Sequence, residues 1–469
     1  MRNYGIAVIG GGPGGYTSAI RAAQLGAKVV LVEKDEVGGM CLHRGCIPTK
    51  TLLHATSFLR TFKKAREYGI NAQDIDTDFS AIQERKESIV AALHTSLQTV
   101  LTNNKIDIIK GRGELVSPGR IAVSISGWEE IIGAERIIVA PGSVPTIPPV
   151  PGALDAGILT TTDMLKIARV PASLLIIGGG VSGVEFASVF SGLGTKVTIV
   201  EKDLRLIPTE DEEISQTLKL LLKSYGVTIY TGCRVKNVRK DQTGVNTVTL
   251  YMENEEKEIS AELLLSCTGR RPNIEDLGTE RLGIIEENGS IQVNRMMETT
   301  IPGVYAVGDA AGGMMLAHKA QMEGIVAAEN ALGARRMMDV SAIPRVIHCQ
   351  TEIAGVGLTE RQARDFGNHV IIGRYQLSAS GMASILREKG FMKIIANREN
   401  GKVLGVHIFS PGASELIGEA ALAMKLGAGI KDIADTVHNH PSFSEGFSEA
   451  ARDAFGEAIY VNPRSKITV

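Results

Sequence analysis

The chain has 469 residues, of which 44% are apolar, and its 50 Lys and Arg nearly balance its 52 Asp and Glu. This length predicts about three domains, and the apolar fraction excludes a disordered chain. A net charge of −2 excludes a nucleic-acid binder that depends on attraction to phosphates. The first strand-like run begins at Tyr4, and no apolar run reaches the roughly 18 residues of a membrane helix. We therefore expect a cytoplasmic protein without membrane insertion.

Two segments, residues 5–35 and 174–203, share one layout: a buried strand, a glycine turn, a helix and a second strand ending in Glu-Lys-Asp. A GxGxxG turn between a strand and a helix lets the backbone approach a pyrophosphate, and the helix N-terminus attracts it. In each segment a glutamate placed 23 positions after the first glycine can accept hydrogen bonds from a ribose. The residues are Gly10, Gly12, Gly15 and Glu33 in the first segment, and Gly178, Gly180, Gly183 and Glu201 in the second. We expect two dinucleotide sites, the second favouring NAD over NADP because Glu201 would repel a 2′-phosphate.

Cys41 and Cys46 lie in the stretch CLHRGCIPTK, shortly after the first nucleotide segment. Pro48 suits the first turn of a helix, and a cysteine near a helix N-terminus forms a thiolate more readily. The spacing favours a redox disulfide. Two reduced structural cysteines, or half of a metal site, stay open, although a metal site needs more ligands than this pair, so no metal is expected. Flavin accepts hydride from nicotinamide and passes electron pairs to disulfides, which predicts FAD in the first segment.

The whole chain resembles the flavin-dependent pyridine nucleotide–disulfide oxidoreductase family. The resemblance rests on the first glycine motif, residues 38–50, the second glycine motif with Glu185, GRRPN (269–273), Gly308-Asp309, LAHKA (316–320) and HNHPSFSE (438–445). It implies an α/β fold with two Rossmann-like nucleotide-binding domains, for FAD and NAD, and an α+β C-terminal dimerisation domain. With the proline-rich linker at 141–152, it predicts an FAD domain formed by 1–145 and 271–338, an NAD domain at 146–270 and a dimerisation domain at 339–469. Apolar runs predict strands over 299–309 and 403–409, and a helical pattern covers 444–459.

The resemblance also implies a role for each matched residue. Cys41 exchanges with a dithiol substrate, and Cys46 lies nearest the flavin. Lys50 approaches the flavin and pairs with Glu185. The other positions implied are Gly14, Lys34, Gly113, Gly142, Asp309, Met315, Leu316, Ala317 and His318 for FAD, and Gly269 for NAD.

His440 and Glu445 supply a candidate acid–base pair. Dithiol oxidation needs a base because only the thiolate attacks, and a histidine oriented by a carboxylate serves this purpose. The resemblance implies that His440 is this base, that Glu445 orients it, that the His440–Pro441 bond is cis, and that the pair acts on the other subunit of a homodimer.

The implied reaction is oxidation of protein-bound dihydrolipoamide to lipoamide by NAD⁺. A lipoyl-bearing acyltransferase or carrier of a 2-oxoacid, acetoin or glycine-cleavage complex would be the partner. A glutathione-type reductase would use NADPH, which Glu201 opposes, and a mercuric-type enzyme would need cysteines after Cys349. A single-sulfur NADH oxidase or coenzyme A disulfide reductase would not need both Cys41 and Cys46. A non-catalytic docking flavoprotein would not need the acid–base pair.

Overall fold

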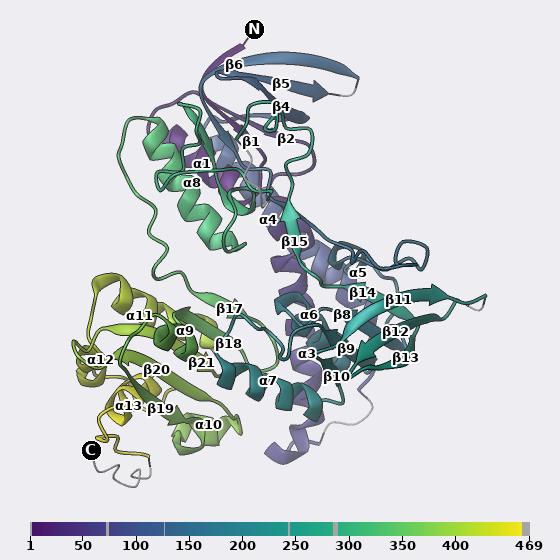
Figure 1. Cartoon of the computed structure of the whole chain (residues 1–469), viewed down its shortest axis with the longest axis vertical. Coiled ribbons are helices and arrows are strands. Elements are labelled where there is room, and N and C mark those ends of the chain that lie inside the picture. The colour runs from purple at the N-terminus through teal and green to yellow at the C-terminus, as the bar shows by residue number, and fades with distance from the viewer. Residues whose placement is uncertain (1, 72–74, 126, 243, 285–288, 462–469) are drawn as a thin grey trace.

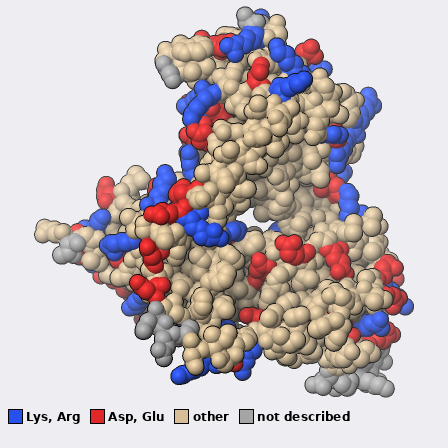
Figure 2. Space-filling view, turned by 180° about the vertical axis from the view of Figure 1, so that it is seen from behind, with Lys and Arg blue, Asp and Glu red and all other residues tan. Residues whose placement is uncertain are grey.

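The computed structural model describes residues 2–71, 75–125, 127–242, 244–284 and 289–461. These residues form three lobes, with the N-terminal lobe above the other two in Figure 1. Seen from behind, Figure 2 shows a hollow between the upper lobe and the two lower ones, and charges of both signs on all three. Among the described residues, no helix has both the length and the apolar composition required to cross a membrane.

The first lobe is a sheet of order β3-β2-β1-β6-β5-β4, with β16 also paired to β6. Strands β3, β2, β1, β6 and β16 run parallel, as expected of a strand–helix–strand nucleotide fold. Because β16 comes from far along the chain, the second lobe is inserted within the first. The elements are β1 (Arg2–Ile9), α1 (Pro13–Gln24), β2 (Val29–Glu33), α2 (Gly39–Arg44), α3 (Cys46–Lys63), η1 (Ala65–Tyr68), α4 (Phe79–Asn103), β3 (Asp107–Lys110), β4 (Arg112–Ser117), β5 (Arg120–Ile125), β6 (Trp128–Val139), β16 (Val304–Ala306), η2 (Gly308–Ala311) and α8 (Ala317–Ala331).

The second lobe repeats the design with a parallel sheet of order β10-β9-β8-β14. An antiparallel sheet, β11-β12-β13, packs beside it, and β7 pairs with β15 where the chain enters and leaves the lobe. The elements are β7 (Ser143–Pro145), α5 (Thr161–Met164), β8 (Ser173–Ile177), α6 (Val181–Gly192), β9 (Lys196–Glu201), α7 (Glu212–Ser224), β10 (Thr228–Thr231), β11 (Arg234–Lys240), β12 (Asn246–Met252), β13 (Glu255–Ala261), β14 (Leu263–Ser266) and β15 (Arg270–Pro272).

The third lobe is an antiparallel sheet of order β17-β18-β21-β20-β19, against which α11 and α13 pack. Side chains along β20 and β21 point alternately to the two faces of this sheet. Apolar side chains on one face form the core of the lobe, and the other face packs towards the second lobe. The elements are β17 (Arg345–Ile347), β18 (Ile353–Gly357), α9 (Glu360–Asp365), β19 (Val370–Gln376), η3 (Leu377–Ala379), α10 (Gly381–Leu386), β20 (Phe391–Asn397), β21 (Val403–Phe409), α11 (Ala413–Leu426), α12 (Ile430–Asp435) and α13 (Glu445–Asp453).

These lobes confirm the predicted fold class, whereas the exact domain boundaries stay a prediction. Two expected elements are shorter than the sequence pattern indicated. The strand expected over 299–309 is only Val304–Ala306, because Gly303 and Gly308 take positive φ angles of 79° and 75° at its two ends. The helix expected over 444–459 ends at Asp453, shortly before Gly456, which also has a positive φ.

Candidate active site

The two glycine motifs form two nearly identical cradles. The first cradle comprises the Gly10–Gly15 turn, the N-terminus of α1 and Glu33; the second comprises the Gly178–Gly183 turn, the N-terminus of α6 and Glu201. Gly10 and Gly178 have φ angles of +99° and +108°, and a Cβ on either would lie 2.2 or 2.3 Å from a backbone carbonyl oxygen of the neighbouring strand end. Only glycine tolerates such a turn.

Both cradles leave room for a phosphate. A Cβ added at Gly12 or Gly180 would meet nothing within 4 Å, and neither helix has a side chain that caps its N-terminus. The first backbone N–H groups of α1 and α6 therefore remain available to an anion. The residues present thus fit a dinucleotide in each cradle.

Glu33 and Glu201 occupy equivalent positions. The carboxylate of Glu33 accepts hydrogen bonds from the N–H groups of Gly11 (2.6 Å) and Asp35 (2.8 Å). The carboxylate of Glu201 accepts from Gly179 (2.5 Å) and Asp203 (2.8 Å). Each carboxylate is therefore fixed against its own glycine turn, with acceptor capacity left for a ribose hydroxyl.

The segment that carries the cysteines is fastened to the first cradle. Gly38 donates its N–H to the carbonyl of Gly11 (2.8 Å), and a Cβ on Gly39 would lie 2.7 Å from the Cα of Gly12. Because Gly38 and Gly39 both have positive φ, the chain can reverse here and start α2 directly against the glycine turn. This contact places Cys41, on α2, and Cys46, at the start of α3, beside the nucleotide site.

Cys41 and Cys46 are free thiols that share a hydrogen bond. The pKa of Cys46 is lowered to about 7, because the Cys41 thiol hydrogen-bonds to it and the Lys50 ammonium attracts its negative charge. The same hydrogen bond and burial raise the pKa of Cys41. Ionisation near neutral pH therefore favours Cys46 over Cys41. Cys46 is also the first residue of α3, where the helix dipole favours a thiolate.

Lys50 and Glu185 form an ion pair between α3 and α6. The Lys50 Nζ lies 2.8 Å from both carboxylate oxygens of Glu185, and the Glu185 side chain is only 5% exposed. The backbone N–H of His348, at the end of β17, also donates to Glu185 Oε1 (3.0 Å). All three lobes thus converge on this carboxylate.

Asp309 lies in η2 and accepts a hydrogen bond from the Ser143 hydroxyl. Arg270 in turn donates to the hydroxyl and the carbonyl oxygen of Ser143, both at 2.7 Å. Burial lowers the pKa of Arg270, while the charges of Asp309 and Cys46 oppose this shift. Sequence reasoning did not single out Ser143 or Arg270. Arg270 lies within the GRRPN motif (269–273), and this motif is the signal in the sequence that points to it.

His440 and Glu445 lie in the loop before α13 and at its first residue. The His440 Nδ1 is 2.7 Å from Glu445 Oε1, and the second oxygen of Glu445 accepts the N–H of Ser442 (2.9 Å). Burial works against the ionised carboxyl, but these two donors lower the pKa of Glu445. The His440–Pro441 bond is cis, as the resemblance implied. The His440 side chain is 73% exposed, and α13 lies well away from α3 in Figure 1.

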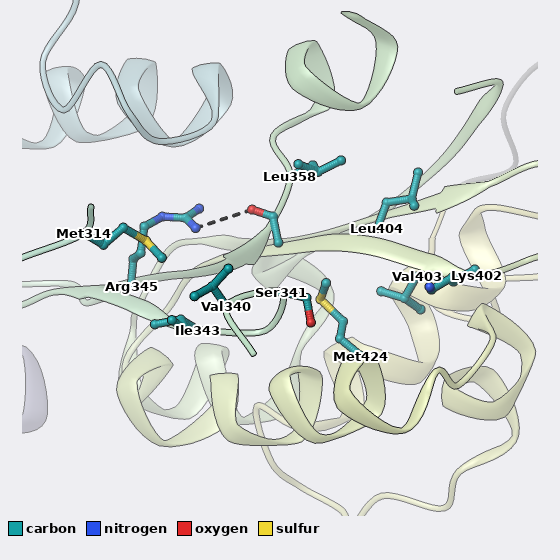
Figure 3. Close-up of a pocket in the computed structure, with 11 residues that line it drawn as sticks. Met314, Val340, Ser341, Ile343, Arg345, Leu358, Lys402, Val403, Leu404 and Met424 are labelled. Carbon is teal, nitrogen blue, oxygen red and sulfur yellow. Dashed lines mark hydrogen bonds between the residues drawn. The ribbon is translucent and has the colours of Figure 1, made fainter. Parts of the chain in front are cut away.

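The remaining predicted residues fall into three groups. Gly142, with a φ of +72°, and Gly269, with a φ of +122°, stand where the chain passes between the first two lobes. Lys34 is exposed, whereas Gly113 on β4 is buried against Ile9 and Val32. Met315, Leu316, Ala317 and His318 lie at the start of α8, whose N-terminus has no side-chain cap. A cavity of about 360 Å³ between Met314 and the third lobe's sheet is lined by none of the predicted site residues (Figure 3).

Comparison with known proteins identifies the family. The sequence profile of the pyridine nucleotide-disulphide oxidoreductases matches residues 4–324, and that of their dimerisation domain matches residues 343–451. The chain belongs to the pyridine nucleotide-disulphide oxidoreductase family, which confirms the resemblance drawn from its motifs and implies FAD and NAD as its cofactors.

Individual relatives carry one recurring name. The chain is 38% identical to a dihydrolipoyl dehydrogenase of Bacillus subtilis over 97% of its own length and 99% of the relative's. It is 39% identical to a dihydrolipoyl dehydrogenase of Thermus scotoductus, over 98% of this chain and 99% of that relative. Among solved structures, it is similar to the Cu(II) complex of the HOCl-induced flavoprotein disulfide reductase RclA from Escherichia coli. That likeness has a TM-score of 0.86 and 28% identity, over 96% of this chain and 99% of that one.

Proposed function

We propose that this protein is a dihydrolipoyl dehydrogenase, which oxidises protein-bound dihydrolipoamide to lipoamide and reduces NAD⁺ to NADH. The observation that carries the proposal is the Cys41–Cys46 pair, in which the pKa of Cys46 is lowered and which Gly38 and Gly39 hold against the first cradle. We assign FAD to the first cradle and NAD to the second, where the Glu201 carboxylate disfavours a 2′-phosphate. The names of the relatives support the choice of substrate.

The cycle starts with Cys41 and Cys46 joined as a disulfide. His440 of the partner subunit takes a proton from one thiol of dihydrolipoamide, and the resulting thiolate attacks the Cys41 sulfur. A bond forms between substrate and Cys41, the Cys41–Cys46 bond breaks, and Cys46 leaves as a thiolate, which its lowered pKa favours. The second substrate thiol then attacks the substrate sulfur bonded to Cys41; the substrate–Cys41 bond breaks, lipoamide forms, and the released Cys41 sulfur takes up the proton that the attacking thiol loses.

FAD, when bound in the first cradle, would supply a two-electron carrier between the dithiol and NAD⁺. Lys50, held by Glu185, places its ammonium where it lowers the pKa of Cys46. Asp309, held by Ser143, and the uncapped N-terminus of α8 would hold the FAD, the helix end favouring negative charge.

The dimerisation domain makes the protein a homodimer, and we propose that its two active sites are shared. The His440 side chain is exposed on its own chain, and α13, which begins at Glu445, lies away from α3 in Figure 1. A base that must reach Cys41 therefore comes from the second copy. We further propose a lipoyl-bearing acyltransferase or carrier protein as partner, a cytoplasmic location, and the domain boundaries at residues 145, 270 and 338.

The test is a pair of spectrophotometric assays on the purified holoenzyme. With NAD⁺ and dihydrolipoamide, NADH should accumulate, and Cys46→Ser should abolish the accumulation. The matched control is Cys233→Ser, which alters a buried thiol away from the pair and should leave turnover intact. Turnover with NADPH and oxidised glutathione, and none with NAD⁺ and dihydrolipoamide, would overturn the proposal.

A further inference from the structure

A continuous series of contacts joins α11 of the dimerisation domain to the Lys50–Glu185 pair. Ser414, in the first turn of α11, donates its N–H (3.0 Å) and hydroxyl (2.8 Å) to Glu352 Oε2. The other oxygen of Glu352 lies 3.3 Å from His348 Nδ1, and the His348 N–H donates to Glu185 Oε1. Neither Glu352 nor His348 has a part in the cycle described above.

Glu352 is suited to hold this segment still. Burial works against its charge, yet the hydrogen bonds from His348 and Ser414 lower the pKa of Glu352, so it stays an anion and an acceptor at neutral pH. Its backbone carbonyl also accepts the N–H of Ser410 (3.0 Å). The short segment between β17 and β18 is therefore anchored at Glu352, four residues from the N–H that touches Glu185.

Glu185 is sensitive to the loss of one donor. It is buried, and the nearby thiols of Cys267 and Cys349 have pKa values raised first by burial and then by the Glu185 charge. An N–H dipole directed at Glu185 Oε1 offsets part of that charge. Without this N–H, more of the negative charge of Glu185 acts on Cys46, and Glu185 attracts the Lys50 ammonium more strongly.

We propose that Glu352 is a positioning residue, which acts through His348 to hold Glu185 against Lys50 beside the Cys46 thiol. The dimerisation domain thereby adjusts the redox thiol of its own chain, in addition to the base it offers the other subunit. The proposal deepens the proposed function and rests on it only in taking Cys46 as the redox thiol.

The groups that face Cys46 are the charged Lys50, Glu185 and Arg270 and the titratable Cys41 and Tyr16. The direction of the effect follows from the charge of Glu185, which raises the pKa of Cys46. Loss of Glu352 should raise the apparent pKa of Cys46 by about half a unit relative to the same protein with Glu352 intact, roughly a threefold change in its ionisation constant. Glu185→Gln removes a charge that raises this pKa and should lower it.

The experiment measures the rate at which iodoacetamide alkylates Cys46 between about pH 5 and pH 10, by mass spectrometry of its peptide, because only the thiolate reacts. The protein is the reduced holoenzyme carrying Cys41→Ser, whose hydroxyl can still donate to Cys46. Cys233, Cys267 and Cys349 compete little near neutrality, since burial raises the pKa of each.

Four variants decide the matter. Glu352→Ala should raise the Cys46 pKa, and Glu352→Gln, which keeps an acceptor for Ser414, should restore most of the original value. In the Glu185→Gln background, Glu352→Ala should cause no further shift. The matched control is Glu399→Ala, which breaks an exposed His–Glu pair in the same domain (3.6 Å, 74% exposed) and should change nothing.

An unchanged pKa in Glu352→Ala, or an equal shift with and without Glu185, would overturn the proposal. If Glu352→Ala does not fold, His348→Phe cuts the same link and should give the same rise. Alkylation reports the thiol whatever the substrate is, so a failed dihydrolipoamide assay leaves this result standing, and an unshifted pKa leaves the proposed reaction standing.

Discussion

Lys393 is the buried centre of an ion cluster that joins α7 of the second lobe to the sheet of the dimerisation domain. Its side chain is 2% exposed, and its Nζ lies 2.9 Å from Asp211, 2.7 Å from Glu213 and 2.9 Å from Glu360. Arg374 also contacts Glu213 (2.6 Å) and Glu360 (3.4 Å). We predict that Lys393→Met separates α7 from the sheet, because the substitution leaves three carboxylates around an apolar side chain.

The magnitude follows from the contacts that remain. Removing one partner of a buried ion pair costs about 3–5 kcal/mol. Here Arg374 still pairs with two of the carboxylates, and Asp211 still accepts the backbone N–H groups of Glu213 (3.1 Å) and Glu360 (3.2 Å). We therefore expect Lys393→Met to cost about 3 kcal/mol of stability, at the lower end of this range.

The sign of the pH dependence follows from the direction of each shift. Although burial opposes it, Lys393 and neighbouring donors lower the pKa values of Asp211, Glu213 and Glu360, and these carboxylates raise that of Lys393. The carboxylates contribute stability above their unfolded pKa of about 4, and this contribution is lost as the pH falls through their lowered pKa values. Lys393 contributes stability below about pH 10, and its contribution is lost as the pH rises through its raised pKa. The deficit of the variant should thus be largest near neutrality and shrink in acid.

The assay is amide hydrogen exchange in α7 and β20 at neutral pH. A loss of about 3 kcal/mol corresponds to roughly a hundredfold faster exchange by local opening. Lys236→Met is the matched control, because Lys236 and its partner Glu256 are 56% and 50% exposed and exposed pairs contribute little. Unchanged protection of α7 in Lys393→Met, or an equal loss in Lys236→Met, would refute the reasoning.

Three further predictions concern the cradles and the base. Gly15→Ala should lower the amount of bound FAD, measured by flavin absorbance, because its Cβ would lie 1.8 Å from the Gly10 carbonyl oxygen. Gly12→Ala is the comparison, because its Cβ would meet no protein atom within 4 Å. A loss of FAD in Gly12→Ala would therefore come from filling the space for the phosphate and not from a clash within the protein. Gly183→Ala should instead weaken NAD binding at normal flavin content, measured by nicotinamide titration. His440→Gln should lower dihydrolipoamide turnover by about 10²–10⁴-fold with FAD content unchanged; full turnover in this variant would exclude it as the base.

Most of the fold could be predicted because its signals are local. The strand, turn and helix of each nucleotide unit follow from apolar runs and glycines within about 30 residues. The strand over residues 403–409 matches β21. The errors arose where the chain turns at glycine for reasons that apolar patterns do not reveal, as at Gly303 and Gly308.

The active site was predictable from its motifs only as separate pieces. The pattern of residues 41–50 predicted a redox pair. It did not predict the close contact between Gly39 and Gly12, which places the two cysteines beside the first cradle. Arg270 and Ser143 are ordinary polar residues in sequence, and their role beside Asp309 emerges only from three hydrogen bonds.

By itself, the sequence predicted the two nucleotide units, the Cys41–Cys46 pair and the His440–Glu445 pair, because each pattern lies within a short stretch of the chain. The tertiary structure alone decided that Lys50, Glu185 and the His348 N–H, from three different lobes, meet at one buried carboxylate. Sequence separation says nothing about such a meeting, because it depends on how the lobes pack. The pKa of Cys46 has both origins: Cys41 and Lys50, which lower it, are close along the chain, whereas burial and the Glu185 charge, which raise it, depend on the packed structure.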